Sequence, residues 1–189
     1  MPSMEDLRTR KTRRAIENAM MELIELKGYP KVKIIDIANR AQVNRNTVYL
    51  HYESKEDIAL SLLKSTYGDN TFTSDIDSLF EKRIHKSDLL NLFEKIINSV
   101  NENIELYRIF LTDKNLSGYS INIISDIQTH LKKHLIDTPN NMNRIIYILS
   151  GIYGVLSRWV IYAKGSKEDI VKELTDLTYS NIFKLEVKK

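Results

Sequence analysis

The sequence of 189 residues contains no cysteine, only six glycines and only three prolines. Without cysteine there is no disulfide framework, no thiolate zinc site and no cysteine nucleophile, which fits a reducing compartment. Helix-breaking residues are scarce and apolar residues recur at helical spacing, so strand-rich, collagenous and disordered classes are disfavoured. The composition therefore predicts an all-α protein.

Long apolar runs are also absent. The most apolar stretch covers only thirteen uncharged positions, residues 145–157, between Arg144 and Arg158, whereas a membrane-spanning helix needs about 20. The segment Met1–Arg14 is charged and lacks the apolar centre of a secretory signal. We therefore expect a cytoplasmic protein in which residues 145–157 form a buried helix.

The excess of positive charge lies in the first third of the chain. Residues 1–64 contain 12 Lys and Arg against 9 Asp and Glu, whereas residues 65–189 contain 16 of each sign. Five of the cations crowd together near the start: Arg8, Arg10, Lys11, Arg13 and Arg14. This clustering is typical of a module that binds a polyanion, although a solvated basic tail has the same composition.

The first third also has the pattern of four helices. Apolar spacing predicts helices over Arg8–Lys27, Ile34–Arg40 and Arg45–His51, and a fourth that begins after Ser54. Gly28 is expected to end the first helix in the left-handed (αL) conformation. Asn44 is expected to cap the third helix and Ser54 the fourth, with Asp57 at the position of a capping-box carboxylate.

The composition changes beyond residue 66. Residues 67–74 are rich in Gly, Asp, Asn and Thr and are predicted to be a linker, which divides the chain into domains 1–66 and 67–189. Apolar spacing predicts further helices at 75–85, 88–103, 105–113, 118–137, 141–164 and 167–185. The whole chain is thus expected to contain about nine to ten helices.

The second and third predicted helices, joined by a short turn, have the pattern of a helix-turn-helix. A recognition helix enters the DNA major groove and presents hydrogen-bonding side chains to base edges. The third helix carries such side chains: Arg45, Asn46, Thr47, Tyr49 and His51. Val48 and Tyr52 can face the opposite way and close a small core with Ile37 and Ala38. An ordinary helical hairpin with a wet polar face remains the alternative.

The run from Arg13 to Leu62 resembles the N-terminal domain of the TetR family of transcriptional regulators. The shared motifs are Lys27-Gly28-Tyr29, Asp36-Ile37-Ala38, Val43-Asn44-x-x-Thr47-Val48-Tyr49, Tyr52 and Ser54-Lys55-Glu56. The resemblance implies a three-helix DNA-binding domain, joined through the fourth helix to a larger helical domain for ligand binding and dimerisation. The candidate DNA contacts are Lys33, Asn44, Arg45, Asn46, Thr47, Tyr49, His51 and Lys55.

Three positions depart from the family pattern. Lys33 stands where a hydroxyl residue usually caps the second helix, so it can contact a phosphate but cannot cap. Gln42 replaces the usual turn glycine, and a non-glycine residue with positive φ is uncommon. Asn46 replaces a glycine of the recognition helix and adds a side chain that can contact a base.

The C-terminal region is expected to form a dimer. Residues 145–163 are apolar around most of the helix circumference, so one face should be buried by its own domain and another by a partner. Helix-turn-helix proteins bind palindromic half-sites as two-fold dimers, although these helices can also serve only as a monomer's core. The candidate interface residues are Ser150, Gly154, Ser157, Leu174 and Leu177. Ser166 is expected to cap the last helix.

Enzyme signatures are missing from the sequence. His130 and His134 have the i, i+4 spacing of a possible metal pair, but no His-Glu-x-x-His motif, phosphate loop or nucleophile elbow accompanies them. We therefore predict no enzymatic activity, no metal site and no cofactor, and a metal-dependent enzyme using this pair is the distant alternative. Residues that can line an effector pocket are Phe93, Tyr107, Phe110, Tyr119, His134 and Tyr147.

Taken together, these patterns predict a repressor that binds a palindromic operator in double-stranded DNA as a homodimer and is released by an effector. The alternative is a coactivator of the same fold whose C-terminal domain binds a protein partner instead of a small molecule.

Overall fold

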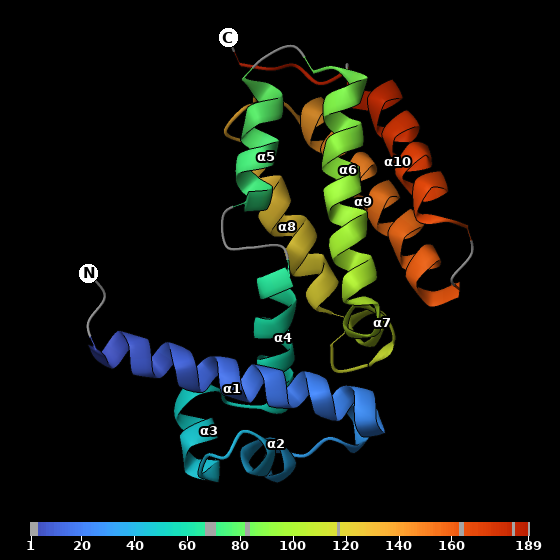
Figure 1. Cartoon of the computed structure of the whole chain (residues 1–189). Coiled ribbons are helices and arrows are strands. Elements are labelled where there is room, and N and C mark those ends of the chain that lie inside the picture. The colour runs from blue at the N-terminus through green and yellow to red at the C-terminus, as the bar shows by residue number, and fades with distance from the viewer. Residues whose placement is uncertain are drawn as a thin grey trace. The chain divides into compact units, whose positions relative to one another are not determined.

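The structure is a computed structural model that describes residues 4–66, 71–81, 84–116, 118–162, 165–182 and 184–188. These ranges contain ten α-helices and one short 3₁₀ helix, η1 (Figure 1). The prediction of an all-α protein with nine to ten helices is therefore confirmed. The chain forms two compact units, residues 1–65 and residues 66–189.

The first unit is built around one long helix and two short ones that pack together. Its elements are α1 (Met4–Lys27), η1 (Tyr29–Lys31), α2 (Ile34–Arg40), α3 (Arg45–His51) and most of α4 (Lys55–Thr66). α1 packs on α2, and α2 packs on α3. The apolar positions that repeat at helical spacing are buried here, among them Ile16, Met20, Ile37, Val48 and Ile58. The second and third helices begin and end at the predicted residues.

Local hydrogen bonds set the ends of these helices. Asn44 Oδ1 accepts a hydrogen bond of 2.9 Å from the Asn46 N–H, so Asn44 caps α3 as predicted. Ser54 Oγ accepts one of 3.1 Å from the Asp57 N–H at the start of α4. The Asp57 carboxylate differs from the prediction, because it reaches back to the Glu53 N–H at 3.1 Å and not to that of Ser54.

Gly28 ends α1 in a conformation other than the predicted one. Its φ of 76° is positive, as expected, but its ψ of 143° lies outside the αL region. An extended ψ combined with a positive φ is open to glycine and strained for other residues. With this extended ψ, the chain continues from Gly28 directly into η1.

The second unit is a layered bundle of six helices. They are α5 (Thr71–Phe80), α6 (Lys86–Glu102), α7 (Ile104–Thr112), α8 (Tyr119–Leu131), α9 (Pro139–Tyr162) and α10 (Lys167–Ile182). α10 packs along α6 and α9, and α9 also contacts α7 and α8. Phe93, Ile97, Trp159 and Leu174 lie in the shared core. Ser166 Oγ accepts from the Asp169 N–H at 3.1 Å, which confirms the predicted cap of the last helix.

Three predicted boundaries in this unit are wrong, and one of them is the end of α5, which lies at Phe80 instead of residue 85. Residues 71–74 are the first turn of α5 rather than part of a linker, and residues 67–70 lie outside the described ranges. α8 ends at Leu131 instead of residue 137. The chain turns there because Leu135 pairs with Val187 in an isolated antiparallel bridge, a contact between segments distant in sequence.

α9 is not the buried helix that its composition predicts. Among the described helices it has the length and apolar composition of a membrane-crossing segment, yet only 17% of its most apolar window is buried in the chain. Its inner side contributes Ile145, Trp159 and Val160 to the core, while Tyr147 is 69% exposed. The chain by itself thus covers one face of α9 and leaves the other open.

Candidate nucleic-acid interface

α3 separates its polar and apolar residues onto two faces. Val48 is fully buried, and Tyr52, directly after the helix, is almost fully buried. Arg45, Asn46 and Tyr49 are exposed on the other face, whereas Thr47 and His51 are half-buried. The residues predicted to meet DNA from this helix therefore include three whose hydrogen-bonding groups are open to a ligand.

Two of the exposed side chains contact each other. Arg45 donates a hydrogen bond of 3.1 Å from Nη2 to the Tyr49 hydroxyl. Its guanidinium carbon also lies 5.4 Å from the centre of the Tyr49 ring. Because Arg45 and Tyr49 are one helical turn apart, this contact holds the guanidinium along the helix surface, where its remaining donors are available.

Leu50 is an exposed residue of α3 that the sequence patterns did not single out. Its side chain is 82% exposed, the largest value among the exposed large apolar residues of the described chain. An apolar group beside hydrogen-bonding ones on a reading helix can contact the methyl group of thymine. The available signal was a leucine placed off the apolar stripe of an otherwise polar helix.

Hydrogen bonds between side chains brace α3 from behind. Tyr52 Oη donates to Glu17 Oε1 at 2.7 Å, and Ser61 Oγ donates to the same oxygen at 2.7 Å. Arg13 donates to Tyr52 Oη at 3.2 Å and to Ser61 Oγ at 3.3 Å. Burial raises the pKa of the Tyr52 hydroxyl, so it stays protonated as a donor. This cluster of Arg13, Glu17, Tyr52 and Ser61 joins α1, the end of α3 and α4.

Arg13 therefore differs from its basic neighbours. The sequence grouped it with Arg8, Arg10, Lys11 and Arg14 as one cationic segment. All five side chains are exposed, but Arg13 also has the structural contacts just described. Its charge is partly used to hold the unit together, which charge counting along the sequence could not distinguish.

The start of α2 uses a different cap from the family's usual hydroxyl. Asp36 Oδ2 accepts a hydrogen bond of 2.9 Å from the Lys33 N–H and one of 2.6 Å from Lys27 Nζ. The Lys27 hydrogen bond is the main cause that lowers the pKa of Asp36. The capping function has shifted to Asp36, and the exposed Lys33 side chain makes no capping hydrogen bond.

Lys55 is engaged within the unit. Its ammonium donates to the Tyr29 carbonyl at 3.1 Å and lies 4.2 Å from the centre of the Tyr29 ring. The tyrosine hydroxyl in turn donates to Glu56 Oε1 at 3.3 Å. A lysine has three donor hydrogens, so Lys55 can hold η1 against the start of α4 and still offer donors to another group.

The turn between α2 and α3 has a positive φ at the position where the family pattern has a glycine. Gln42 has a φ of 55°, and it is the one non-glycine residue with positive φ in the described chain. The residues on both sides of Gln42 are held by hydrogen bonds, since the Ala41 N–H donates to the Ile37 carbonyl at 2.9 Å and the Val43 N–H donates to the Ala38 carbonyl at 3.0 Å. The turn therefore keeps its geometry without the glycine.

The residues predicted to line an effector pocket are not gathered around one cavity. Phe93 and Phe110 are buried in the core, while Tyr147 is exposed. The Tyr107 hydroxyl, whose pKa is raised by burial, is paired with Thr66 Oγ1 at 2.8 Å. His134 lies beside Asp77. Most of these aromatic residues therefore pack in the core and do not line a cavity, since the helices bury them against one another.

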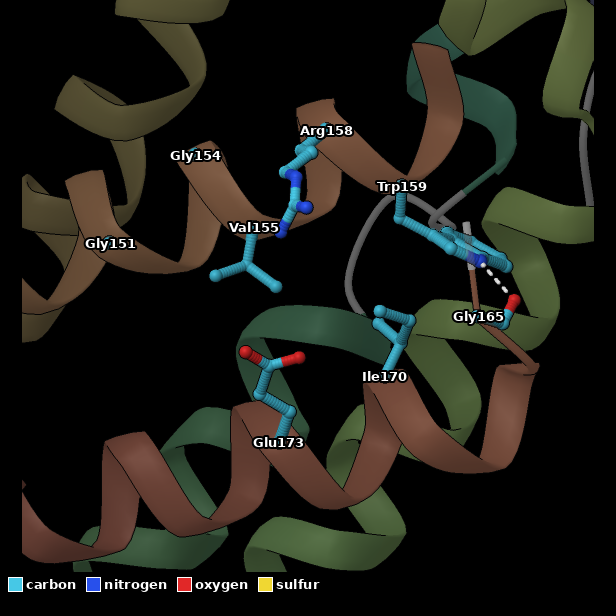
Figure 2. Close-up of a pocket in the computed structure, with 8 residues that line it drawn as sticks. All are labelled: Gly151, Gly154, Val155, Arg158, Trp159, Gly165, Ile170 and Glu173. Atoms are coloured by element: carbon cyan, nitrogen blue, oxygen red, sulfur yellow. Dashed lines mark hydrogen bonds between the residues drawn. The ribbon is translucent and has the colours of Figure 1, made fainter. Parts of the chain in front are cut away.

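A pocket of about 480 Å³ lies elsewhere in the second unit, between α9 and α10 (Figure 2). It is lined by Gly151, Gly154, Val155, Arg158, Trp159, Gly165, Ile170 and Glu173. The Trp159 indole closes one end, where Nε1 donates to the Gly165 carbonyl at 3.3 Å. None of the six residues predicted to line a pocket belongs to it.

The predicted dimer residues fall into different environments. Ser150 and Gly154 are exposed on α9, and Leu177 is 50% exposed on α10. Leu174 is fully buried in its own unit, so its side chain offers no surface to a partner and its assignment is wrong. The Ser157 hydroxyl is buried without a hydrogen-bond partner within the described residues.

Comparison with known proteins identifies the class to which this architecture belongs. Residues 16–62 match the family model described as "Bacterial regulatory proteins, tetR family". A fatty acid metabolism regulator protein of Bacillus subtilis (strain 168) is 40% identical over 53 residues, or 28% of this chain. The match spans only 27% of that relative's own length.

Solved structures extend the likeness to the whole chain. Thermus thermophilus FadR, a TetR-family transcriptional repressor solved with lauroyl-CoA, covers 90% of this chain and 94% of its own, with a TM-score of 0.61 and 18% identity. The dihydroxyacetone kinase operon activator DhaS covers 93% and 98%, with a TM-score of 0.64 and 18% identity. Residues 16–62 are therefore a TetR-family helix-turn-helix domain, and the whole chain has the fold of TetR-family transcriptional regulators.

Proposed function

We propose that this protein is a transcriptional repressor that binds a palindromic operator in double-stranded DNA as a homodimer. The observation that carries the proposal is the two-faced α3, with Val48 buried behind it and Arg45, Asn46 and Tyr49 exposed in front. A short helix with rigidly held, exposed donors is what readout of base edges in the major groove requires.

Phosphate contacts in this proposal come from the cations around α3. Lys33 is exposed at the start of α2, and Arg8, Arg10, Lys11 and Arg14 are exposed on α1. Such side chains position a protein on the duplex and make its affinity depend on salt, whereas the α3 side chains provide sequence selectivity. Lys55 can also contact a phosphate, with the ammonium hydrogens that are not donated to the Tyr29 carbonyl.

The open faces of α9 and α10 support the dimer. Ile146, Tyr147 and Tyr162 on α9 and Leu177 on α10 are exposed apolar residues. Gly151 and Gly154 leave open space where a side chain would stand, so a second helix can approach α9 closely there. Two such chains would place two α3 helices on successive half-sites, about 34–36 Å apart.

Control by an effector is the remaining part of the proposal. The second unit would bind a small molecule and change the operator affinity through α4, which begins directly after the DNA-reading helices. The relative named for fatty acid metabolism matches over only 53 residues, 28% of this chain and 27% of its own length, so we extend its manner of DNA binding to this chain and not its effector. The same fold is found in a repressor and in an activator, and the coactivator alternative therefore stays in the test.

The test is selection of bound fragments from random duplex DNA with the intact, tag-free protein. We expect an enriched palindrome with half-sites about one helical turn apart. A promoter–reporter fusion carrying that palindrome then gives the sign of regulation, with lower expression for a repressor. Failure to enrich any sequence, together with millimolar affinity for duplex DNA at low salt, would refute the DNA-binding function.

A further inference from the structure

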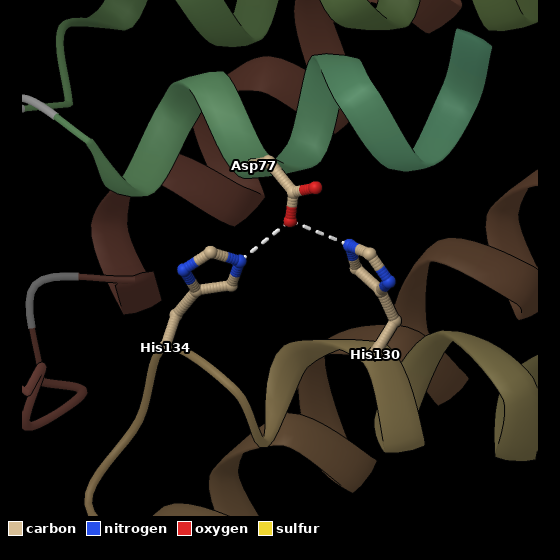
Figure 3. A group of neighbouring side chains, drawn as sticks. All are labelled: Asp77, His130 and His134. Carbon is tan, nitrogen blue, oxygen red and sulfur yellow. Dashed lines mark hydrogen bonds and ion pairs between the residues drawn. The ribbon is translucent and has the colours of Figure 1, made fainter. Parts of the chain in front are cut away.

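Three side chains in the second unit converge on one point (Figure 3). Asp77 Oδ1 lies 2.6 Å from His130 Nε2 and 2.6 Å from His134 Nε2. Asp77 is on α5, His130 is in the last turn of α8, and His134 follows the end of that helix. Their ligand atoms lie within 4.8 Å of one another, so they have the arrangement of a small coordination sphere.

We propose that Asp77, His130 and His134 bind one divalent transition-metal ion of the Zn²⁺ class. Two imidazole nitrogens and one carboxylate oxygen suit Zn²⁺ and its neighbours, and a tetrahedral ion with three protein ligands keeps a fourth position for water. The site is separate from the α3 surface and does not depend on the proposed operator binding.

Admitting an ion requires the three donor atoms, which lie within 4.8 Å of one another, to adopt the spacing of a coordination sphere. With metal–ligand bonds of about 2.0–2.1 Å and tetrahedral angles, neighbouring donor atoms lie about 3.3 Å apart. The Asp77 oxygen must therefore move away from each imidazole by less than about 1 Å. The Asp77 side chain is 38% exposed, which gives it room to do so, whereas the His130 and His134 side chains are only 12% and 22% exposed.

The surroundings prepare the ligands for this role. Phe80, one turn after Asp77 on α5, stacks on the His134 ring with centroids 5.2 Å apart and an interplanar angle of 14°. This contact fixes the orientation of the imidazole. Asp77 Oδ1 faces the Nε2 atoms of both imidazoles, so the carboxylate is placed to act as the third ligand.

The positive charge of Lys133 should weaken metal binding at this site, which gives the proposal a specific test. Its exposed ammonium lies 3.4 Å from His130 Nδ1, on the side of the ring away from Asp77. When Nε2 binds a metal, Nδ1 must carry the proton and donate it elsewhere. The Lys133 contact has to break in the bound state, and its positive charge disfavours a cation nearby. Removing the lysine should therefore strengthen metal binding.

The proposal is tested by titrating tag-free, chelator-treated protein with ZnCl₂ in a calorimeter. We expect one ion per chain, micromolar or tighter affinity, and a rise of several degrees in the melting temperature, because the ion binds only the folded chain. Asp77→Asn and His134→Gln should each weaken binding by about 100-fold or more, since losing even an outer-shell partner costs roughly 10–100-fold. Lys133→Ala should bind several-fold more tightly.

His85→Gln is the matched control, because His85 is exposed and lies outside the cluster. It should bind Zn²⁺ like the wild type. Circular dichroism identifies any variant that does not fold. If either Asp77→Asn or His134→Gln fails to fold, the Zn²⁺ affinity of the other variant tests the proposal. The proposal is overturned if the wild type shows no heat or melting shift at 100-fold excess of ZnCl₂, or if folded Asp77→Asn or His134→Gln binds as the wild type does. In that case the cluster only joins α5 to the end of α8 by hydrogen bonds.

Discussion

The Tyr52 hydroxyl donates a hydrogen bond of 2.7 Å to Glu17 Oε1 and so ties the end of α3 to the middle of α1. The two residues are far apart in sequence, and Tyr52 is almost fully buried. The same hydroxyl accepts from Arg13 at 3.2 Å. The position of the exposed α3 side chains therefore depends on a polar cluster behind them.

Replacing Tyr52 by Phe should lower the free energy of unfolding by about 1–2 kcal/mol, because hydrogen bonds to charged partners are lost inside a packed site. Urea denaturation followed by circular dichroism measures the change. Tyr49→Phe is the control, since its exposed hydroxyl contacts only Arg45, and its effect should stay within about 0.5 kcal/mol. Equal losses in both variants would mean that the cluster around Tyr52 has no special role.

Replacing Gln42 by Gly should leave stability unchanged or raise it by up to about 1 kcal/mol. Relief of the positive φ should raise the free energy of unfolding by roughly 1–2 kcal/mol. The larger conformational entropy of glycine in the unfolded chain should lower it by about 0.5–1 kcal/mol. Ala15→Gly, in the interior of α1, should instead destabilise by about 1 kcal/mol. Opposite signs in thermal denaturation are the expected result, and a clear loss of stability at Gln42→Gly would contradict the strain argument.

Replacing Arg45 by Ala should change which bases are preferred in the operator, at a cost of about 1–3 kcal/mol on the preferred sequence. Replacing Lys33 by Ala should weaken binding to all sequences and reduce the slope of log affinity against log salt by about 0.9. Lys33 is chosen over Lys55 because Lys55 also holds Tyr29. Fluorescence anisotropy at several salt concentrations separates the two effects, and identical behaviour of the two variants would speak against the proposed division of roles.

Replacing Gly154 by Leu should weaken the proposed dimer by roughly 1–3 kcal/mol through overpacking. Apart from its own chain neighbours and the adjacent backbone of α9, no atom of the described residues lies within 4 Å of a side-chain carbon built at Gly154, so the fold of the single chain should be unaffected. Glu94→Leu on α6 is the control, because it adds the same exposed side chain on another helix. Sedimentation equilibrium should show dissociation only for Gly154→Leu, and a wild type that is monomeric at micromolar concentration would exclude the dimer.

The ion pair of Asp36 should make stability depend on acid pH. Its pKa is lowered by the hydrogen bonds from Lys27 and the Lys33 N–H, so the unfolded chain takes up a proton at a higher pH than the folded chain does. The stabilisation is therefore complete above about pH 4, the ordinary pKa of aspartate, and is lost as the pH falls further. Asp36→Asn should be less stable than the wild type at pH 6, and the difference should shrink below pH 4. A difference that stays constant down to pH 2 would contradict this account.

Features with local causes could be derived from the sequence alone. α2 and α3 begin and end at the predicted residues because their apolar spacing and the Asn44 cap act within a few residues of each other. The cap at Ser166 is local in the same sense. The exposed polar face of α3 followed from the same pattern, since burying Val48 leaves Asn46, two residues away on the helix, on the opposite side.

Features that join distant segments were decided only by the tertiary structure. Packing of α10 on α6 buries Leu174, which helical spacing alone had placed on a dimer surface. The Arg13 and Tyr52 contact separates one arginine from a uniform basic segment, and Asp77 completes a group in which the sequence showed only His130 and His134. Sequence periodicity reports which residues share a face of one helix, but not which other helix covers that face, because that depends on how the helices pack together.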